Sequence, residues 1–220
     1  MIDPSLQRLN MVESQVRPSD VTDRRILRAM LEIPREEFLP ASVRDTAYMD
    51  GPVPLTTDGD MRMLLPPRTF AKLIQLADIP EDGRVLDVGC ASGYSTAVLA
   101  HLAHTVIGLD SNSEFAERAR SLLASLGVAN AEIVTGQLAH GAPDQGPYDA
   151  IVINGAVADA PRALLTQLKD GGRLVAILGG GPSAKATLWC KTGQTTDSRA
   201  AFDATAAILP GFARAREFVF

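Results

Sequence analysis

The chain has 220 residues, 46% of them hydrophobic, and 21 Lys and Arg against 26 Asp and Glu give a formal net charge of −5. This length suits one domain with a substantial core, and the acidic balance argues against a broad basic surface for nucleic acid. The two cysteines, Cys90 and Cys190, show no disulfide or metal-ligand spacing. The chain also lacks a leader-like start and any run of membrane-span length, so we expect a cytoplasmic protein without metal, nucleic-acid or membrane partners.

The N-terminal quarter reads as helical and then extended. We expect a helix over residues 4–17 and a second one that is capped by Ser19 or Thr22 and stopped by Pro34. Residues 47–55 read as extended, because positions before proline avoid the helical region.

The central stretch of the chain predicts a strand, a glycine turn and a helix. Pro66 and Pro67 begin a helix that precedes it. A β-branched run over 85–88 then breaks at Gly89, and apolar residues at helical spacing resume from Tyr94. This unit opens an α/β sheet in which ligands bind outside the carboxyl ends of the strands.

The remaining sequence alternates strands with helices. We expect a capping box made by Ser111 and Glu114, a helix end at Gly127, and a further helix that starts at Pro161 and stops at Gly171 and Gly172. Residues 191–214 read as irregular. The expected strands are 105–110, 131–135, 148–155, 173–178, 185–190 and 215–220, and they form a mostly parallel sheet with helices on both faces.

The glycine turn indicates which ligand the sheet binds. Its spacing, Gly89-x-Ala91-x-Gly93, differs from the dinucleotide pattern, and Asp87 just before it repels a pyrophosphate but attracts a cationic amino acid end. Asp110, which ends the next strand about 20 residues on, suits the hydroxyls of a ribose. A nucleoside joined to an amino acid describes S-adenosylmethionine.

This stretch resembles motif I of the class I S-adenosylmethionine-dependent methyltransferases. The resemblance implies a Rossmann-like fold, with a seven-stranded sheet and an N-terminal helical extension. It also implies S-adenosyl-L-methionine as cofactor and S-adenosyl-L-homocysteine as product. The cofactor-binding residues that we expect are Asp87, Gly89, Cys90, Ala91, Gly93, Tyr94, Asp110, Ser111, Gly136, Gln137, Leu138, Asn154 and Gly155.

Three N-terminal segments are similar to signatures of one methyltransferase family. They are Met11–Gln15, Ile33–Pro40 and Ala47–Pro54, and a fourth similar passage, Gln167–Val175, follows downstream. Their order resembles the protein-L-isoaspartate (D-aspartate) O-methyltransferases. The resemblance implies methylation of the carboxylate of isomerised aspartate in a damaged protein or peptide. It also implies a single domain over 1–220, with a substrate-side region over 1–65 and a cofactor-binding core over 66–220.

The sequence departs from the family in three places. Leu65 stands where the family carries a serine near the methyl acceptor, in a Ser/Thr-Ile-Ser-Gln-Pro segment that is absent here. Gln137 and Leu138 replace an Asp-Gly pair, and Ala91 replaces a glycine. We expect the acceptor pocket among Val53, Pro54, Leu64, Leu65 and Asn154, and the catalytic group is open.

Two other functions remain open at this point. The chain can be a methyltransferase with a different acceptor, such as a small molecule, or a non-catalytic relative that binds cofactor or a protein partner. The sequence is compatible with either a monomer or a dimer.

Overall fold

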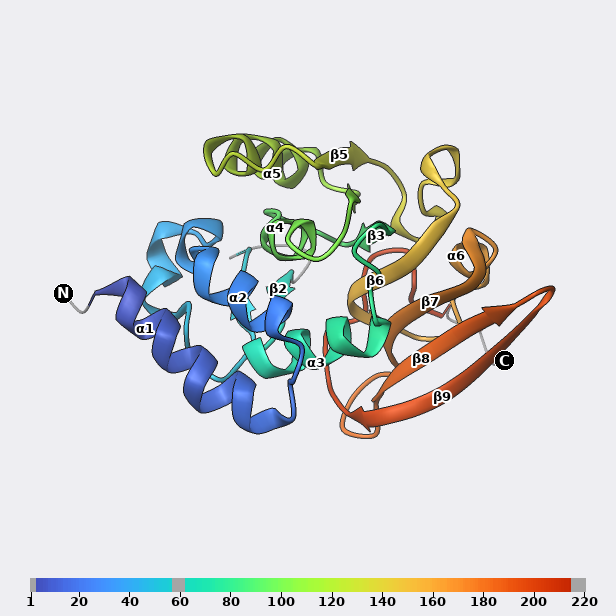
Figure 1. Ribbon diagram of the computed structural model, residues 1–220, viewed down its shortest axis with the longest axis horizontal. Coiled ribbons are helices and arrows are strands. Elements are labelled where there is room, and N and C mark those ends of the chain that lie inside the picture. Colours follow the sequence, from blue (N-terminus) through green and yellow to red (C-terminus); the bar gives the residue numbers. More distant parts are fainter. Residues whose placement is uncertain (1–2, 57–61, 215–220) are drawn as a thin grey trace, which may run out of the picture.

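The computed structural model describes residues 3–56 and 62–214, which Figure 1 shows built around one main sheet. Within this part of the chain the sheet has seven strands in the order β5-β4-β3-β6-β7-β8-β9. Strands β3 to β7 run parallel, whereas β8 and β9 form an antiparallel hairpin at one edge. The mostly parallel, seven-stranded prediction is confirmed. The strands are β3 (Arg84–Val88), β4 (Thr105–Asp110), β5 (Ala131–Thr135), β6 (Tyr148–Val157), β7 (Leu168–Leu178), β8 (Lys185–Thr192) and β9 (Thr195–Asp203).

One face of the sheet is covered by regular helices. They are α3 (Pro67–Ala77), α4 (Tyr94–Ala100) and α5 (Ser113–Ser125). Alternate strand residues such as Val85, Val106 and Val152 point to this face and join the larger hydrophobic core. Because all of α4 except its last residue is buried, this helix lies at the centre of the layer, between the sheet and the N-terminal extension.

The N-terminal extension packs on the outside of α3 and α4. It consists of helices, at the left of Figure 1, and a two-stranded hairpin that leads back to the main sheet. The cap of its second helix is Asp23, whose carboxylate accepts from the backbone N–H of Arg25, so the prediction of Ser19 or Thr22 was wrong. The elements are α1 (Pro4–Met11), η1 (Val12–Val16), η2 (Arg17–Ser19), α2 (Arg24–Glu32), η3 (Arg35–Phe38), η4 (Ala41–Thr46), β1 (Val53–Pro54) and β2 (Met63–Leu64).

The opposite face has a thinner cover. Among the described residues it carries short helices alone, η5 (Leu138–His140), η6 (Pro143–Gln145) and α6 (Arg162–Leu165), together with the irregular segment 204–212. We call this segment the C-terminal strap; its Leu209 and Phe212 join the second hydrophobic core, which includes Leu86 and Ile151. The strap therefore covers part of this face of the sheet.

Two sequence predictions about element boundaries were wrong, and a third is not tested. The helix expected to run from Pro161 to Gly171 ends at Leu165, because Leu168 already pairs with Tyr148 and starts β7. Residues 195–203 form strand β9 rather than an irregular stretch. The strand expected over 215–220 lies outside the described residues.

The start of α5 also differs from the prediction. Asn112 is its cap, and the Oδ1 atom of Asn112 accepts from the backbone N–H groups of Glu114 (2.8 Å) and Phe115 (3.1 Å). The predicted capping box of Ser111 and Glu114 is therefore wrong, because the cap lies one residue later. Gly127, with φ of 70°, follows the last turn of α5 as expected.

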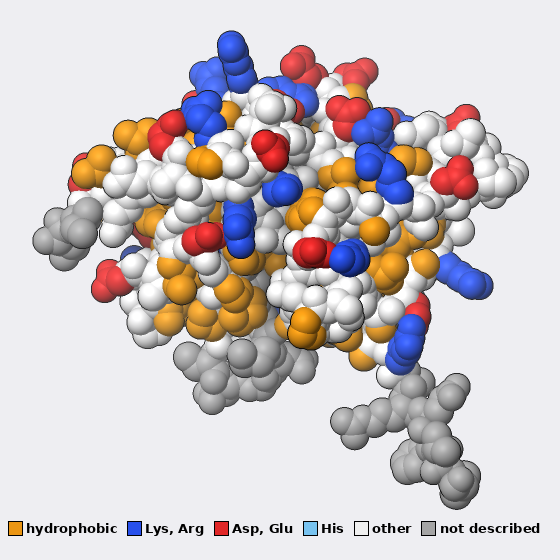
Figure 2. Space-filling view, turned by 90° about the horizontal axis from the view of Figure 1, so that it is seen from below, with side chains coloured by type: hydrophobic (Ala, Val, Ile, Leu, Met, Phe, Trp, Pro, Cys, Tyr) orange, Lys and Arg blue, Asp and Glu red, His pale blue; other side chains and the backbone are white. Residues whose placement is uncertain are grey.

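The surface mixes charges of both signs. On the face shown in Figure 2, Lys and Arg side chains lie among Asp and Glu side chains, and they form no continuous basic area there. No helix within residues 3–56 and 62–214 is both long and apolar enough to cross a membrane. The same residues contain no group of three or more His, Cys, Asp or Glu side chains placed to hold a metal ion.

Candidate active site

The candidate site lies at the carboxyl edge of the parallel strands. Strand β3 ends in the turn that begins at Gly89, its neighbour β4 ends at Asp110, and β6 carries Asn154 near its end. The chain order reverses between β3 and β6, since β4 lies on one side of β3 and β6 on the other. Such a switch point is where open α/β sheets form their ligand crevice.

The glycine turn has two positions with different roles. Gly89 has φ of 76°, and a Cβ atom added there would point towards the crevice. Gly93 has φ of 94°, but an added Cβ would lie 3.0 Å from the Cβ of Ala119 on α5. Gly93 therefore permits close packing of the turn against α5, and its place among the cofactor-binding residues stays a prediction.

Asp110 is the most heavily bonded carboxylate at this edge. Its Oδ2 accepts from the backbone N–H of Ala91 (2.7 Å) and its Oδ1 from that of Asn112 (3.0 Å). Both oxygens also accept from the guanidinium of Arg62, at 3.1 and 2.6 Å, and both side chains are buried. A carboxylate has about four lone-pair positions, so Asp110 has none left for a ribose in this conformation.

Asp87 lies deeper, beneath the glycine turn. Its Oδ2 accepts from the hydroxyls of Ser95 (2.7 Å) and Thr96 (2.5 Å), and its Oδ1 accepts from the amide of Asn154. Complete burial raises the pKa of Asp87 to about 6, although these three donors oppose the rise. Asp87 is thus tied to α4 and β6 rather than exposed to the crevice.

The C-terminal strap covers the other half of the crevice. Leu209 lies over two glycines: its Cδ1 is 2.8 Å from the position of a Gly89 Cβ, and its Cγ is 2.6 Å from that of a Gly155 Cβ. A backbone bridge holds it there, because the Leu209 N–H donates to the Ala156 carbonyl and the Ala156 N–H to the Ala207 carbonyl, both at 2.9 Å.

The described conformation does not accommodate the predicted cofactor. Arg62 takes the carboxylate of Asp110 that would hold the ribose, and Leu209 takes the space that Gly89 and Gly155 leave open. Asp87, Asp110 and Asn154, which come from three neighbouring strands, nevertheless lie close together at this edge. Ser92, inside the turn, also has a buried hydroxyl without a hydrogen-bond partner among the described residues.

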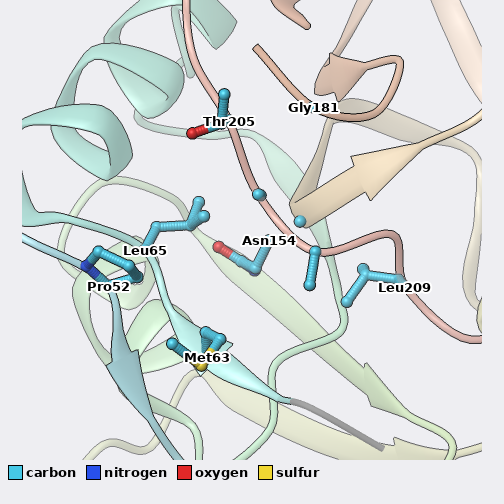
Figure 3. Close-up of a pocket in the computed structure, with 10 residues that line it drawn as sticks. Pro52, Met63, Leu65, Asn154, Gly181, Thr205 and Leu209 are labelled. Atoms are coloured by element: carbon cyan, nitrogen blue, oxygen red, sulfur yellow. The ribbon is translucent and has the colours of Figure 1, made fainter.

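A cavity of about 340 Å³ lies beside the crevice. Figure 3 shows its walls: the hairpin side chains of Pro52, Met63 and Leu65, the end of β6, and the strap. Among the described lining residues, Asn154 and Thr205 alone have polar side chains. The described lining residues are Pro52, Met63, Leu65, Asn154, Gly155, Gly181, Thr205, Ala206, Ala207 and Leu209.

Asn154 connects the cavity to Asp87. Its amide nitrogen donates to Asp87 Oδ1 and to the Ser95 hydroxyl at 3.2 Å, so both of its N–H bonds are used. Its oxygen is directed towards the side of the cavity where Leu65 lies (Figure 3). Asn154 therefore presents a hydrogen-bond acceptor, and not a donor, to anything in the cavity.

The other predicted acceptor-side residues lie around this cavity. Leu65 lines it, whereas Val53 and Pro54 pair with Leu64 and Met63 in the small hairpin and are not among the lining residues. The buried Arg35 fixes this region, because its guanidinium donates to the carbonyls of Leu65 (2.9 Å) and Ala47 (2.8 Å).

The remaining predicted cofactor residues are more dispersed. The ring of Tyr94 packs against Phe38 and Phe70, within the larger hydrophobic core. Cys90 is buried, and burial raises the pKa of its thiol. Ser111 and Gln137 are exposed, Gly136 is half-buried, and Leu138 belongs to the second core.

Sequence reasoning missed Arg62, Leu209 and Ser92. The first two reach the crevice from far along the chain, so no local spacing marks them. Ser92 lies within the glycine turn, and its place between Ala91 and Gly93 was the one available signal.

These features define a class I methyltransferase fold with its ligand crevice at the carboxyl edge of the sheet. A sequence profile of the protein-L-isoaspartate(D-aspartate) O-methyltransferase family matches residues 7–201. The chain belongs to this family.

Similar proteins and structures agree with this placement. The protein-L-isoaspartate O-methyltransferases of Methanoculleus marisnigri and Syntrophus aciditrophicus are each 40% identical to the chain, over 79% of its length and 77% and 78% of theirs. A solved protein-L-isoaspartate O-methyltransferase superposes with a TM-score of 0.80 at 26% identity, covering 93% of this chain and 66% of that one. A putative Plasmodium falciparum member, solved in complex with S-adenosyl-L-homocysteine, has a TM-score of 0.75 at 18% identity and covers 95% of this chain and 99% of that one; it shows the fold alone.

Proposed function

We propose that the protein is an S-adenosylmethionine-dependent methyltransferase that methylates the carboxylate of isoaspartyl residues in proteins or peptides. One observation carries the proposal. In a chain of this family, a cavity that can receive a side chain opens directly beside the crevice formed by Gly89, Asp110 and Asn154. A cytoplasmic location stays a prediction from the sequence, as does the division of the domain near residue 65.

The proposed reaction needs little general acid-base catalysis by the protein. S-adenosylmethionine supplies the methyl group as a sulfonium electrophile, and a carboxylate acceptor with a reference pKa near 4 is already ionised at neutral pH. The task of the chain is to position the acceptor and exclude water. The apolar walls made by Met63, Leu65 and Leu209 suit water exclusion.

A second candidate acceptor is favoured by the polarity of the cavity. Asn154 offers an oxygen there, and Leu65 offers no hydrogen bond at the position of the family's serine. An acceptor that donates a hydrogen bond, such as a hydroxyl or an amine, would match Asn154 better than a carboxylate does. The hydroxyl of Thr205 is the side-chain donor that a carboxylate could still use.

The test is methyl transfer from labelled S-adenosylmethionine to a matched pair of peptides that differ only in one isoaspartyl or aspartyl residue. We expect label in the isoaspartyl peptide alone, released by mild base as a methyl ester should be. Label in neither peptide, with calorimetric binding of S-adenosylhomocysteine intact, would turn the assignment to the second acceptor class. Absence of both transfer and binding would favour a non-catalytic relative.

A further inference from the structure

Two side chains from distant parts of the chain meet in the cofactor crevice. From the position of a Gly89 Cβ, the nearest atoms are Leu209 Cδ1 at 2.8 Å and Arg62 Nη2 at 3.5 Å. Arg62 precedes β2 and Leu209 belongs to the C-terminal strap, so both of these segments close over the same side of the turn.

Arg62 is held by more than its ion pair with Asp110. Its guanidinium carbon lies 5.6 Å from the ring centroid of Phe115, on α5. Its backbone carbonyl accepts from the N–H of Leu55 at 2.8 Å, which extends the β1–β2 pairing. A buried arginine in bidentate contact with a carboxylate is a strong, oriented contact, and any cofactor hydroxyl must replace it.

The strap is held by backbone bonds on both sides of Leu209. Besides the bridge to Ala156, the N–H of Ala158 donates to the Phe212 carbonyl at 3.1 Å. The guanidinium of Arg214 pairs with Asp159 at 2.7 Å beyond it. Leu209 is thus presented to the crevice by an ordered segment that is bonded to the end of β6.

We propose that Arg62 and Leu209 form an autoinhibitory contact: the cofactor binds only when Arg62 leaves Asp110 and Leu209 leaves Gly89 and Gly155. The identity of the cofactor rests on the proposed function; the competition rests on the contacts above. The apparent affinity is then the intrinsic affinity multiplied by the fraction of molecules with an open crevice. Arg62 blocks the carboxylate of Asp110 and Leu209 blocks the space over Gly89 and Gly155, so a substitution can remove either contact without the other.

The experiment measures S-adenosylhomocysteine affinity by calorimetry for the wild type, Arg62→Met and Leu209→Ala. Methionine keeps much of the length of Arg62 without its charge. We expect each variant to bind roughly tenfold or more tightly, the gain that applies when the contact it removes is open in at most about 10% of molecules. Matched controls are Ile208→Ala, at a neighbouring strap residue that is 39% exposed, and Arg25→Met, which breaks a different arginine–aspartate pair at the start of α2. Neither control should change the affinity.

A second measurement uses the wild-type protein, because both variants lose stability. Leu209→Ala removes part of the second core, and Arg62→Met leaves the buried carboxylate of Asp110 without its partner. Amide hydrogen exchange is followed at Leu209, whose N–H donates to Ala156. Ligand binding ordinarily slows exchange at a site it covers. Displacement of the strap requires the opposite, so we expect faster exchange at Leu209 in the presence of saturating S-adenosylhomocysteine.

The outcomes separate this proposal from the proposed function. Equal affinities in the wild type and both folded variants, or slower exchange at Leu209 with ligand, would overturn the autoinhibitory contact and leave the methyltransferase assignment standing. Tighter binding in the variants without isoaspartyl methylation would support the contact and count against that acceptor. No binding by any folded protein would overturn the contact and the cofactor assignment together.

Discussion

The backbone N–H of Ala91 donates to Oδ2 of Asp110 at 2.7 Å, and Ala91 is held there with φ of 48°, in the left-handed region. A residue with a Cβ pays about 1–2 kcal/mol in that region. Glycine avoids this strain but loses about 0.4–1 kcal/mol through the greater freedom of the unfolded chain.

Ala91→Gly should therefore leave the free energy of unfolding unchanged or raise it by up to about 1.5 kcal/mol. Urea unfolding followed by circular dichroism measures it. The control is Ala97→Gly, inside α4, which should lower the same quantity by about 1 kcal/mol or more. Equal losses in both variants would show that the turn does not strain Ala91.

Asp110 should matter for folding as well as for ligand binding. Asp110→Ala leaves the buried guanidinium of Arg62 without its partner, which should lower the free energy of unfolding by about 3–5 kcal/mol. The double variant Arg62→Met with Asp110→Ala removes both charges and should lose less than the Asp110→Ala variant alone. A double-mutant cycle with strictly additive losses would mean that the pair contributes no coupling.

Asp87 should make stability depend on pH. Its pKa is raised from 3.8 to about 6 by burial, so the folded protein binds this proton more tightly than the unfolded chain does. The contribution is present below about pH 4 and is lost as the pH rises through about 6, a loss of about 3 kcal/mol.

Asp87→Asn removes this titration and can still accept from Asn154. We expect its stability relative to the wild type to increase between about pH 4 and pH 7.5, by up to about 3 kcal/mol. Urea unfolding at a series of pH values tests this, with Glu13→Gln on the exposed side of η1 as a control. A relative stability that is flat across this range would contradict the raised pKa of Asp87.

Leu65 should limit isoaspartyl methylation. A hydroxyl at this position could donate to an acceptor carboxylate, and a hydrogen bond to a charged group contributes about 1.5–3 kcal/mol. We expect slow transfer to the isoaspartyl peptide by the wild type and a gain of roughly tenfold or more for Leu65→Ser at unchanged cofactor affinity.

The matched control is Leu64→Ser. Leu64 is 7% exposed and Leu65 is 6% exposed, but only Leu65 lines the cavity. Both variants should lose stability through lost burial, and only Leu65→Ser should gain transfer. Rapid wild-type transfer that Leu65→Ser fails to improve would place the donor elsewhere, with Thr205→Val as the next variant to assay.

The cap of α5 gives a simple stability test. Asn112→Ala removes an acceptor from two backbone N–H groups and should lower the free energy of unfolding by about 1 kcal/mol. Ser111→Ala, one residue earlier and exposed, should be nearly neutral. The opposite ranking would restore the capping box that the sequence had predicted.

The parallel core was predictable because its signals are local. The β-branched run of β3 and the apolar β4 that ends in Asp110 mark their strands by composition alone, and residues 131–135 were predicted with their observed boundaries. The elements on the opposite face of the sheet, which carries the short helices and the strap, were not predictable from local signals. Leu168 has a helix-like place in the sequence, and only its pairing with Tyr148 across the sheet makes it the start of β7.

The site residues also fall into those that local spacing reveals and those that only tertiary contacts reveal. Asp110 and the glycine turn could be located from spacing, and the structure brings them together. The partner of Asp110 could not be located in this way, because Arg62 lies 48 residues away in the sequence and meets Asp110 only in the tertiary structure. The role of Gly93 also depends on a tertiary neighbour, Ala119, that no local pattern reveals.

The place of Leu209 and Phe212 in the second core has a calorimetric consequence. A ligand that enters a preformed apolar cleft buries surface and gives a negative heat-capacity change. If entry first lifts the strap, these two side chains leave the sheet and expose apolar surface, which raises the heat capacity. These two heat-capacity changes oppose each other, so the enthalpy of cofactor binding should vary unusually little with temperature. It should vary more steeply with temperature in the Leu209→Ala variant.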